Sequence, residues 1–599
     1  MQTRLRLTAF ALAMTVAPQT AWACGGFFNT TEPVDQEAER IIFRQLDAET
    51  VESYIEIRFQ GDPREFAWVV PVPGVPKIET FPAAAFDALD VATEPRFDLP
   101  DGCRFSDDRS VPPQGGNVEV GEPSATGVTV LASSIVGDYE TETLSATGAA
   151  ELYIYLNDNG FRVVEQMVPF IELYIGQGLN FVAVKLRSDL PNGAGSITPL
   201  KLTYKSERPM IPLRLTSMAA VPEMGVKVFI LGEERFTTDG VPELEIDASA
   251  IVWDSNTRRS NYASVVARTI DGSLGEGMVV DMAGETGPVK DGLAAARTSD
   301  SNPEQSPEEI ERIRALQEGE DAVAALVDAS PYLTRFYGRY SPEEMGVDLF
   351  FRADASRPNV DRSRALPVAQ VLSCQAGEPA PEPCDYSTCG QGGTCVIQVS
   401  VGGEPSSADG VTSGDATSPD DGMVSSAGRE SDAACACVDG AVARAVRDPD
   451  GSGDVRISCV DDRIRFDFEN VKPIYDIQPI SLPALPDPCA QNPCGENGEC
   501  VSMNGAQSCR CDRGYVAIAK ETSDGELQAV CVSPKDELPA SFYQRRLPDP
   551  QLPYPGKIAR RSGLTADNGC TLTVPGAQSP SAALALLALA IPLLRRRRR

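Results

Sequence analysis

The stretch CAQNPCGENGECVSMNGAQSCRCDRGY (residues 489–515), together with Cys531, decides the fold of the C-terminal part of the chain. Its six cysteines follow the spacing Cys-x4-Cys-x5-Cys-x8-Cys-x-Cys-x19-Cys. A domain of this size buries too little apolar surface to be stable alone, and exported proteins supply the missing stability with disulfides. A zinc site is the rival interpretation, but no C-x-x-C pair occurs, so disulfides are favoured.

An upstream segment repeats this cysteine pattern with one long gap. Cys384, Cys389 and Cys395 keep the first spacings, and 39 residues then precede Cys435, Cys437 and Cys459. The gap is rich in Ser, Gly, Asp and Ala, which predicts a low-complexity insertion at about residues 398–434.

Both six-cysteine sets resemble epidermal-growth-factor-like (EGF-like) modules, the second down to Gly514-Tyr515 after the C-x-C pair. The resemblance implies two small disulfide-rich β modules, each with three bridges. The implied pairs are Cys384 with Cys395, Cys389 with Cys435, Cys437 with Cys459, Cys489 with Cys500, Cys494 with Cys509, and Cys511 with Cys531.

One loop of the first module carries oxygen ligands at calcium-loop spacing. Asp448, Asp450, Ser452 and Asp454 fit the first half of an EF-hand-like loop, but Cys459 stands where a bidentate Glu is needed. An acidic solvated turn is therefore preferred, and Ca²⁺ is the one cofactor that the sequence keeps open.

Residues 24–372 form the largest region, whose pattern predicts an α+β or mixed α/β domain. β-Branched and aromatic runs predict strands near residues 39–45, 51–61, 66–76, 179–187, 197–205 and 225–232. Helices are expected at 148–161 and 166–178, stopped by Gly160 and Gly176, and from a capping box at Ser306 to about Ala329.

Several segments of this region match a known pattern: ACGGFF (residues 23–28), PVDQEAERIIF (33–43), FAWVVPVP (66–73), PLRLT (212–216) and YLTRFYGRYSPEEM (332–345). In this order they resemble a bacterial family of exported proteins, domain of unknown function 2330, over Cys24 to about Arg352. The resemblance implies location and a continuous fold, but no reaction and no catalytic residues.

Composition excludes several kinds of chemistry. The 599 residues include no histidine, which removes Ser-His-Asp and Cys-His catalysis and His-bearing zinc sites. The formal net charge is -33, and seven arginines lie in the terminal segments, so the body is more acidic still. Such a surface repels nucleic acid and favours cationic partners, such as divalent metal ions. No pair of carboxylates can be chosen from sequence as catalytic.

The N-terminus reads as an export signal over residues 1–23: a basic start, an apolar run and a small-x-small site that ends at Ala23. Cleavage there leaves Cys24 first in the mature chain. The lipoprotein alternative, with Cys24 acylated, fits poorly because Trp22 is bulky. We expect Cys24 to pair with Cys103 in the same domain, which leaves Cys374 without a partner.

The C-terminus, residues 570–599, has Cys570, a mostly polar spacer, thirteen apolar residues and five arginines. This order resembles the C-terminal sorting signals of myxobacterial exported proteins, which implies processing and lipid attachment at Cys570. The apolar run is about 20 Å long as a helix, short for a membrane of roughly 30 Å, so a temporary span is favoured over a retained tail anchor. The linkers are expected at 463–487 and 534–569, between modules at 373–462 and 488–533.

Two functions compete. The first is an exported, surface-anchored, non-enzymatic binding or adhesion protein on the outer surface of a Gram-negative cell, with a protein or polysaccharide ligand. The second is an exported hydrolase in residues 24–372 that uses carboxylates or a metal. The first is preferred because the sequence presents no catalytic constellation. Its further partners would be the export and sorting machinery and, through the tail, the membrane.

Overall fold

The computed structural model describes residues 26–547 except 30–34, 61–65, 101–127, 162, 164–166, 188–197, 297–306, 373–381, 398–430, 432, 448–453, 462–486, 491, 504–505, 523–525 and 535–536. The export signal at 1–23, the pair Cys24 and Cys103, Cys374 and the tail from Cys570 therefore lie outside the described residues, as do Asp448, Asp450 and Ser452.

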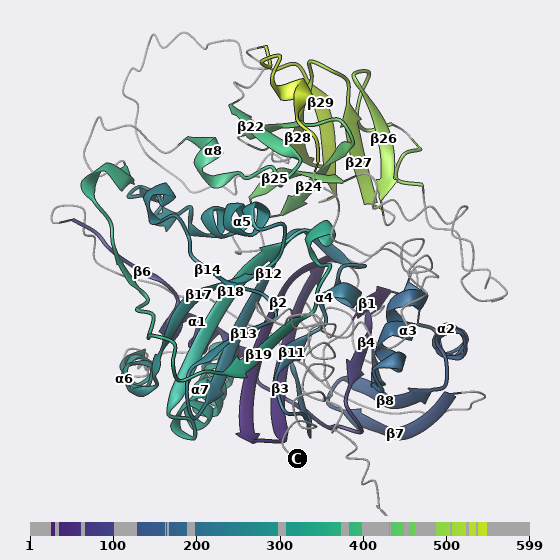
Figure 1. The fold of residues 1–599 in the computed structure, drawn as a ribbon, viewed down its shortest axis with the longest axis vertical. Coiled ribbons are helices and arrows are strands. Elements are labelled where there is room, and N and C mark those ends of the chain that lie inside the picture. The colour runs from purple at the N-terminus through teal and green to yellow at the C-terminus, as the bar shows by residue number, and fades with distance from the viewer. Residues whose placement is uncertain are drawn as a thin grey trace, which may run out of the picture. The chain divides into compact units, whose positions relative to one another are not determined.

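An eight-stranded sheet forms the centre of the large domain (Figure 1). In spatial order its strands are β14 (Glu243–Leu244), β17 (Met278–Glu285), β18 (Tyr332–Tyr340), β12 (Ala220–Gly232), β2 (Asp35–Asp47), β3 (Thr50–Gln60), β10 (Leu200–Lys205) and β5 (Lys77–Thr80). Alternation along the strands gives the sheet two different faces: Ile41 and Phe43 enter one core cluster, and Ile42 enters another.

A five-stranded antiparallel sheet packs against the inner face of the eight-stranded sheet. Its strands, in spatial order, are β1 (Gly26–Asn29), β4 (Phe66–Val72), β9 (Asn180–Leu186), β8 (Tyr139–Ala146) and β7 (Val128–Val136). Trp68 and Val70 of β4 share a core with Ile41 and Val228 of the larger sheet. The opposite face is covered by α2 (Ala149–Asp158) and α3 (Val168–Gly176).

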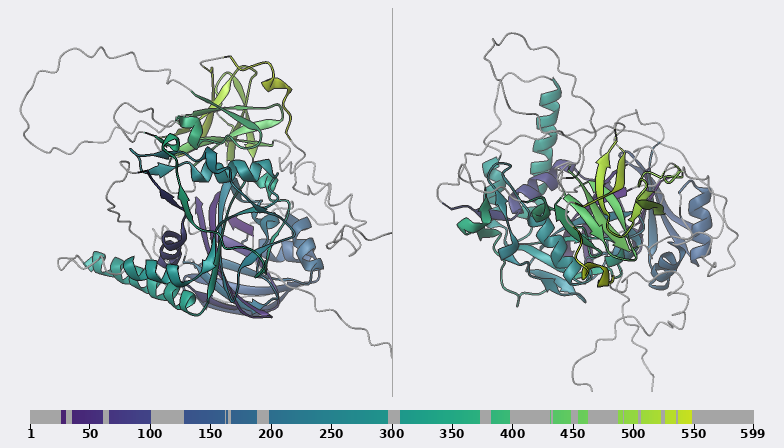
Figure 2. Two further views of the ribbon diagram at one scale, coloured as in Figure 1. Left: turned by 60° about the vertical axis from the view of Figure 1, so that its left-hand side comes forward. Right: turned by 90° about the horizontal axis from the view of Figure 1, so that it is seen from above.

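Three helices cover the outer face of the eight-stranded sheet: α1 (Ala83–Thr93), α6 (Gly287–Ala296) and α7 (Pro307–Asp328) (Figure 2). The large domain therefore has four layers, helix, sheet, sheet and helix. A further helix, α5 (Tyr262–Gly272), packs against β18 in the inner core. The remaining elements of the large domain are β6 (Arg96–Asp98), β11 (Met210–Ile211), α4 (Leu213–Thr216), β13 (Phe236–Asp239), η3 (Ala248–Ala250), β15 (Trp253–Asp254), β16 (Arg259–Ser260), η4 (Pro342–Glu344), β19 (Leu349–Ala353), β20 (Ser363–Ala365), η5 (Val368–Gln370) and β21 (Val371–Leu372).

The two six-cysteine modules fold together into two four-stranded sheets with one shared core. One sheet has the order β22 (Gly393–Ile397), β23 (Ala433–Cys437), β28 (Val516–Glu521) and β29 (Leu527–Val532); the other has the order β25 (Val455–Asp461), β24 (Ala441–Arg447), β27 (Ala506–Cys511) and β26 (Gly498–Met503) (Figure 1). Short helices α8 (Pro383–Tyr386) and η7 (Phe542–Gln544) flank them. Each sheet takes one hairpin from each module. We call this structure the disulfide unit.

The six disulfides of this unit are the pairs that the EGF-like resemblance implies: Cys384–Cys395, Cys389–Cys435, Cys437–Cys459, Cys489–Cys500, Cys494–Cys509 and Cys511–Cys531. Their Cα–Cα distances of 5.4 to 5.7 Å are normal for such bonds.

The two modules are related by an internal pseudo-two-fold symmetry. Cys435 of the first module pairs in register with Ala517 of the second, and Cys509 of the second pairs with Ala443 of the first. Ala443 and Ala517 each lie six residues after the fifth cysteine of their module, so the two contacts are equivalent. The modules, which the sequence suggests are separate, are thus joined by the same contact made twice.

Most of the strand and helix predictions in the large domain are confirmed. Gly160, with φ of 78°, ends α2 in the left-handed conformation as expected. The expected stop at Gly176 is displaced, because α3 runs through Gly176 and the left-handed residue is Gly178 (φ 79°). Helix α7 ends at Asp328, one residue from the prediction, although Ser306 of its capping box is outside the described ranges.

The shared core predicts that the two modules unfold together. Removing the Cys511–Cys531 bond by Cys511→Ser with Cys531→Ser should cost about 2 to 4 kcal/mol. It should also raise deuterium exchange in β24 of the first module, since the same core supports both modules. The matched control removes the equivalent bond, Cys437–Cys459, and should deprotect β28 of the second module. Exchange confined to the module that lost its bond would contradict the shared core.

Candidate functional site

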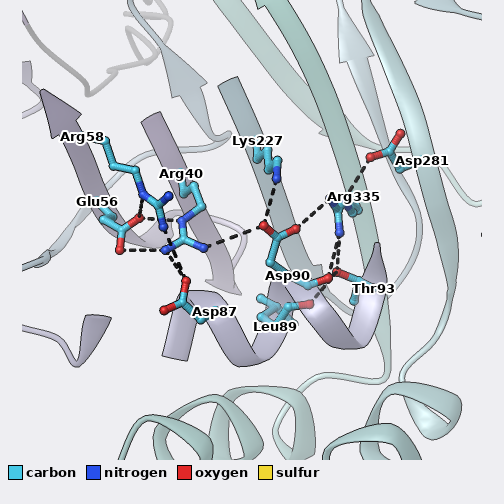
Figure 3. Close-up of polar contacts among 10 residues, drawn as sticks. All are labelled: Arg40, Glu56, Arg58, Asp87, Leu89, Asp90, Thr93, Lys227, Asp281 and Arg335. Atoms are coloured by element: carbon cyan, nitrogen blue, oxygen red, sulfur yellow. Dashed lines mark hydrogen bonds and ion pairs between the residues drawn. The ribbon is translucent and has the colours of Figure 1, made fainter. Parts of the chain in front are cut away.

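A row of charged side chains crosses the outer face of the eight-stranded sheet beneath α1 (Figure 3). It runs through five neighbouring strands, with Asp281 on β17, Arg335 on β18, Lys227 on β12, Arg40 on β2 and Glu56 on β3. Arg40 is opposite Lys227 in one strand pair and opposite Glu56 in the other, so these three side chains share a face. Arg40 holds Glu56 through two bonds of 2.5 and 2.8 Å.

Helix α1 supplies Asp90 to the centre of this row. Its carboxylate lies 2.7 Å from Arg335, 2.9 Å from Lys227 and 3.7 Å from Arg40. Burial alone would raise the pKa of Asp90, but the charges of these three cations outweigh burial and hold the pKa well below its usual range. Asp90 is therefore an anion near neutral pH.

Arg335 links α1 to the far strand of the row. It donates to the Asp90 carbonyl at 3.0 Å and to Thr93 Oγ1 at 3.1 Å in the last turn of α1, where a cation is favourable for the helix dipole. On its other side it binds Asp281 at 3.0 Å, and the Tyr262 hydroxyl donates to the same carboxylate. Asp281 lies at a β-bulge, which turns its side chain towards Arg335 and Tyr262.

Positive and negative charges are equal in number in this ion network, which consists of Arg40, Arg58, Lys227 and Arg335 with Glu56, Asp87, Asp90 and Asp281. Each side chain contacts at least one of opposite sign. The ions at the centre of the network, Asp90, Arg40 and Arg335, are largely buried and paired, so they hold α1 in one geometry on the sheet.

A second group of buried ionisable residues has the opposite character, because acids outnumber bases. Glu223, Asp271, Glu343, Glu344 and Asp461 gather where the first module contacts the large domain, and we call them the carboxyl cluster. The bases that face them are Arg339, Arg456 and Arg268.

Glu223 is the central residue of the carboxyl cluster and is 1% exposed. It lies where the pairing of β12 with β2 shifts register, with a left-handed φ of 57°. Such a bulge turns a side chain that regular pairing would point elsewhere. Its carboxylate lies 3.2 Å from Arg456 of the first module and 3.6 Å from Arg339 of β18, and Thr388 Oγ1 donates to it.

Glu343 and Glu344 belong to the short helix η4 and lie beside Glu223 of β12. Glu344 accepts from the Ser341 backbone N–H at 2.8 Å and from Gln391 of the first module at 2.5 Å. Glu343 is 6% exposed, and its Oε2 atom has no hydrogen-bond partner among the described residues.

The excess of negative charge in the carboxyl cluster is reduced because some of the carboxylates bind a proton. Burial raises the pKa of Glu343 to about 8, and the charges of Asp461, Asp271 and Glu223 add to this effect. Burial and the charge of Glu343 likewise raise the pKa of Glu344 to about 8. Burial, with Glu344 and Glu223, raises the pKa of Asp271. Neutral carboxylic acids near pH 7 are therefore the chemical feature of this candidate site.

Asp454 is the sequence-predicted site residue, apart from the disulfide cysteines, that lies in the described part of the chain. Its carboxylate binds Arg259 of the large domain at 2.9 Å, an exposed ion pair. Within the described ranges, no group of three or more Asp, Glu, Cys or His side chains could hold a metal ion, and none of the helices is long and apolar enough to cross a membrane.

Sequence reasoning missed both charged groups for an identifiable reason. Glu52, Glu56 and Arg58 alternate with apolar residues along β3, as on a solvent-facing strand, yet α1 covers that face around Glu56. For the carboxyl cluster, the available signal was the pair Glu343-Glu344 after Ser341-Pro342, which has the form of a helix start. Nothing in the sequence indicates that another module covers it.

Together, the four-layer domain and the six disulfides define a mixed α/β protein with a disulfide-rich C-terminal unit. Six disulfides indicate an extracytoplasmic protein, since thiols stay reduced in the cytosol. The chain belongs to the family described as "Uncharacterized protein conserved in bacteria (DUF2330)", which matches residues 18–351. No curated protein and no solved structure matches the chain.

The position of Asp90 predicts a large loss of stability from a minimal change. Asp90→Asn leaves three cations facing a neutral group and should cost about 3 to 5 kcal/mol in urea unfolding at pH 7. Because the folded-state pKa of Asp90 is depressed, this difference from the wild type should shrink as the pH falls below about 4, where the wild-type carboxylate also becomes protonated on unfolding.

Asp87→Asn is the matched control on the same helix. The Asp87 side chain is 58% exposed, and its ion pairs with Arg40 and Arg58 should contribute roughly 0 to 1 kcal/mol. Equal costs for the two variants would contradict the central role of Asp90.

Proposed function

We propose that this protein is an exported, surface-anchored binding or adhesion protein with no catalytic activity of its own. In this proposal residues 1–23 direct export, the two six-cysteine modules are EGF-like, and the tail from Cys570 is a sorting signal that retains the protein at the outer surface of a Gram-negative cell. The ligand is a protein or a polysaccharide.

The observation that carries the proposal is the fusion of both modules into one disulfide unit. Besides the shared core, Arg447 of the first module binds Glu521 of the second at 2.6 Å, and Arg513 of the second binds Asp439 of the first at 2.8 Å. A cross-linked unit keeps its surface loops in fixed relative positions. Pre-organised loops lose little entropy on binding, which suits recognition.

The disulfide unit is also tied to the large domain, so a ligand held by the unit is held by the whole protein. Val446 of β24 belongs to the inner core of the large domain, and β24 contacts strand β12. Asn261 donates to the Asp385 carbonyl at 3.1 Å, and Ser264 donates to the Tyr386 carbonyl at 2.6 Å. These contacts transmit force, as adhesion requires.

Charge narrows the class of ligand. With a net charge of -33, the protein repels anionic polymers and lipids. Exposed acids on the second module, including Glu496 and Glu499, give it the same local sign. The ligand is therefore a neutral polysaccharide or a basic protein surface.

An exported hydrolase in the large domain is the alternative, and the raised pKa values of Glu343 and Glu344 favour it, because a neutral carboxyl can donate a proton. Their burial argues against it. The residues are 6% and 1% exposed and lie beneath the first module, where their neighbours are protein groups.

Calcium binding by Asp448, Asp450, Ser452 and Asp454 is a separate proposal that bears on the first module only. The ion pair of Asp454 with Arg259 favours the solvated turn. A thermal-shift titration with Ca²⁺ tests it: a shift that Asp450→Asn abolishes would support calcium, and no shift would remove it.

Binding is tested with labelled protein, residues 24–569, added to intact cells that lack the gene. We expect saturable binding that unlabelled protein displaces. The variant Glu496→Lys with Glu499→Lys reverses charge on the second module and should weaken binding at least severalfold, because the complementary surface would then be repelled. The matched control is Glu311→Lys on α7, whose side chain is 75% exposed and distant in sequence from the unit.

Non-saturable binding, or equal loss in both variants, would contradict the proposed role of the disulfide unit. Turnover of a glycoside or ester substrate that Glu343→Gln abolishes would favour the hydrolase instead.

A further inference from the structure

The carboxyl cluster lies at the contact through which the large domain holds the disulfide unit. From the large domain come Glu223 at the β12 bulge, Glu343 and Glu344 in η4, and Asp271 at the end of α5. The first module contributes Arg456 and Asp461 from β25 and the neutral groups Thr388 and Gln391. Carboxyls of both parts are thus buried against one another.

The three bases of this contact act on other acids of the cluster than Glu343. Arg456 and Arg339 both approach the Glu223 carboxylate, at 3.2 and 3.6 Å. Arg268 acts on Asp271 and lowers its pKa against the other influences. Tyr340 donates its hydroxyl to the Gly277 carbonyl at 2.6 Å. The charged groups that act most strongly on the pKa of Glu343 are the acids Asp461, Asp271 and Glu223.

Burial and like charge therefore make Glu343 hold its proton while the contact is closed. Glu344 accepts two hydrogen bonds that partly stabilise its charge, whereas Glu343 Oε2 has no hydrogen-bond partner among the described residues. An ionised carboxylate in that position would be buried and repelled by Asp461, Asp271 and Glu223, which outweighs the hydrogen bond from its own backbone N–H. When the two parts separate, water can reach the side chain and the charge is no longer costly.

We infer that this contact is a proton-controlled latch: the disulfide unit stays docked on the large domain while Glu343 is a neutral acid, and it loosens when Glu343 ionises. The sign follows from linkage. The docked state holds a proton that the open state releases, so docking is strongest in acid and weakens as the pH rises.

Proton linkage also sets how strongly docking should depend on pH. The docked pKa of Glu343 is about 8 and an exposed Glu titrates near 4.5, so docking is fully favoured below the lower value and loses its proton-linked part as the pH rises through 8. One coupled proton changes the ratio of docked to open protein by up to about tenfold per pH unit in this window. Between pH 6 and 8, the ratio should fall on the order of a hundredfold.

Hydrogen–deuterium exchange of the mature protein at pH 6 and pH 9, with exchange times corrected for the intrinsic rate, tests the latch. In the wild type, protection should fall at pH 9 at residues 221–223 of the β12 bulge, which lie outside the strand registers, and at residues 387–391, which carry Thr388 and Gln391. The β2–β3 hairpin should stay protected, which shows that the domain is folded. Glu343→Gln, a permanent mimic of the neutral acid, should keep both contact segments protected at pH 9.

Two comparisons complete the test. Asp454→Asn removes a carboxylate of the same contact whose side chain is 64% exposed. This variant should leave the pH dependence of docking unchanged. Glu344→Gln provides a second neutral mimic if Glu343→Gln does not fold, and should flatten the pH dependence in part. A wild-type contact that is equally protected at both pH values would overturn the latch. So would a folded Glu343→Gln variant whose contact loosens at pH 9 as the wild type does.

Discussion

Asp90 faces Arg40, Lys227 and Arg335 at once, and the arrangement of the outer layer depends on this contact. The three cations come from three adjacent strands, so α1 is held across the sheet rather than along one strand. Helices α6 and α7 pack against α1 and the same face through apolar contacts, including Val289 and Val323. Apolar packing alone tolerates sliding, whereas the ion network fixes where α1 lies on the sheet.

The ion network and the carboxyl cluster offset the free-energy cost of burying charged side chains in different ways. In the ion network, charges of both signs are equal in number, and the acid at its centre stays ionised. In the carboxyl cluster, acids exceed bases, so the cost is met by protonation, as the raised pKa values of Glu343 and Glu344 express. The charge of Asp90 therefore does not respond to pH near neutrality, whereas the charges of Glu343 and Glu344 do. The balanced charges of the ion network thus keep α1 fixed on the large domain. The excess of acids in the carboxyl cluster makes the contact with the disulfide unit depend on pH.

Sequence patterns identified six strands, β2, β3, β4, β9, β10 and β12, and the helices α2, α3 and α7, because each carries a clear period or a distinct stop signal. Helix α1 was not predicted, since PAAAFDALDVATE is short, has Asp90 on its buried side and lacks a capping side chain. The period-two pattern of β3 separates its two faces but cannot tell solvent from a helix that covers one of them. The cysteine spacing predicted two modules, yet the contacts between them are made by small residues, Ala443 and Ala517, that leave no mark in composition. The carboxyl cluster depends on residues more than 200 positions apart, Glu223 and Arg456, which no local pattern joins.

The pseudo-symmetry of the disulfide unit raises the question of why the contacts with the large domain described above come from the first module. The equivalent positions differ in chemistry. Val446, which enters the inner core, corresponds to Lys520, and Arg456, which binds Glu223, corresponds to Gln528. A lysine would bury a charge in that core, and a glutamine would leave the Glu223 carboxylate with one fewer cation. The backbone of the unit is thus nearly two-fold while its side chains are not, and the side chains of the first module suit the contact with the large domain.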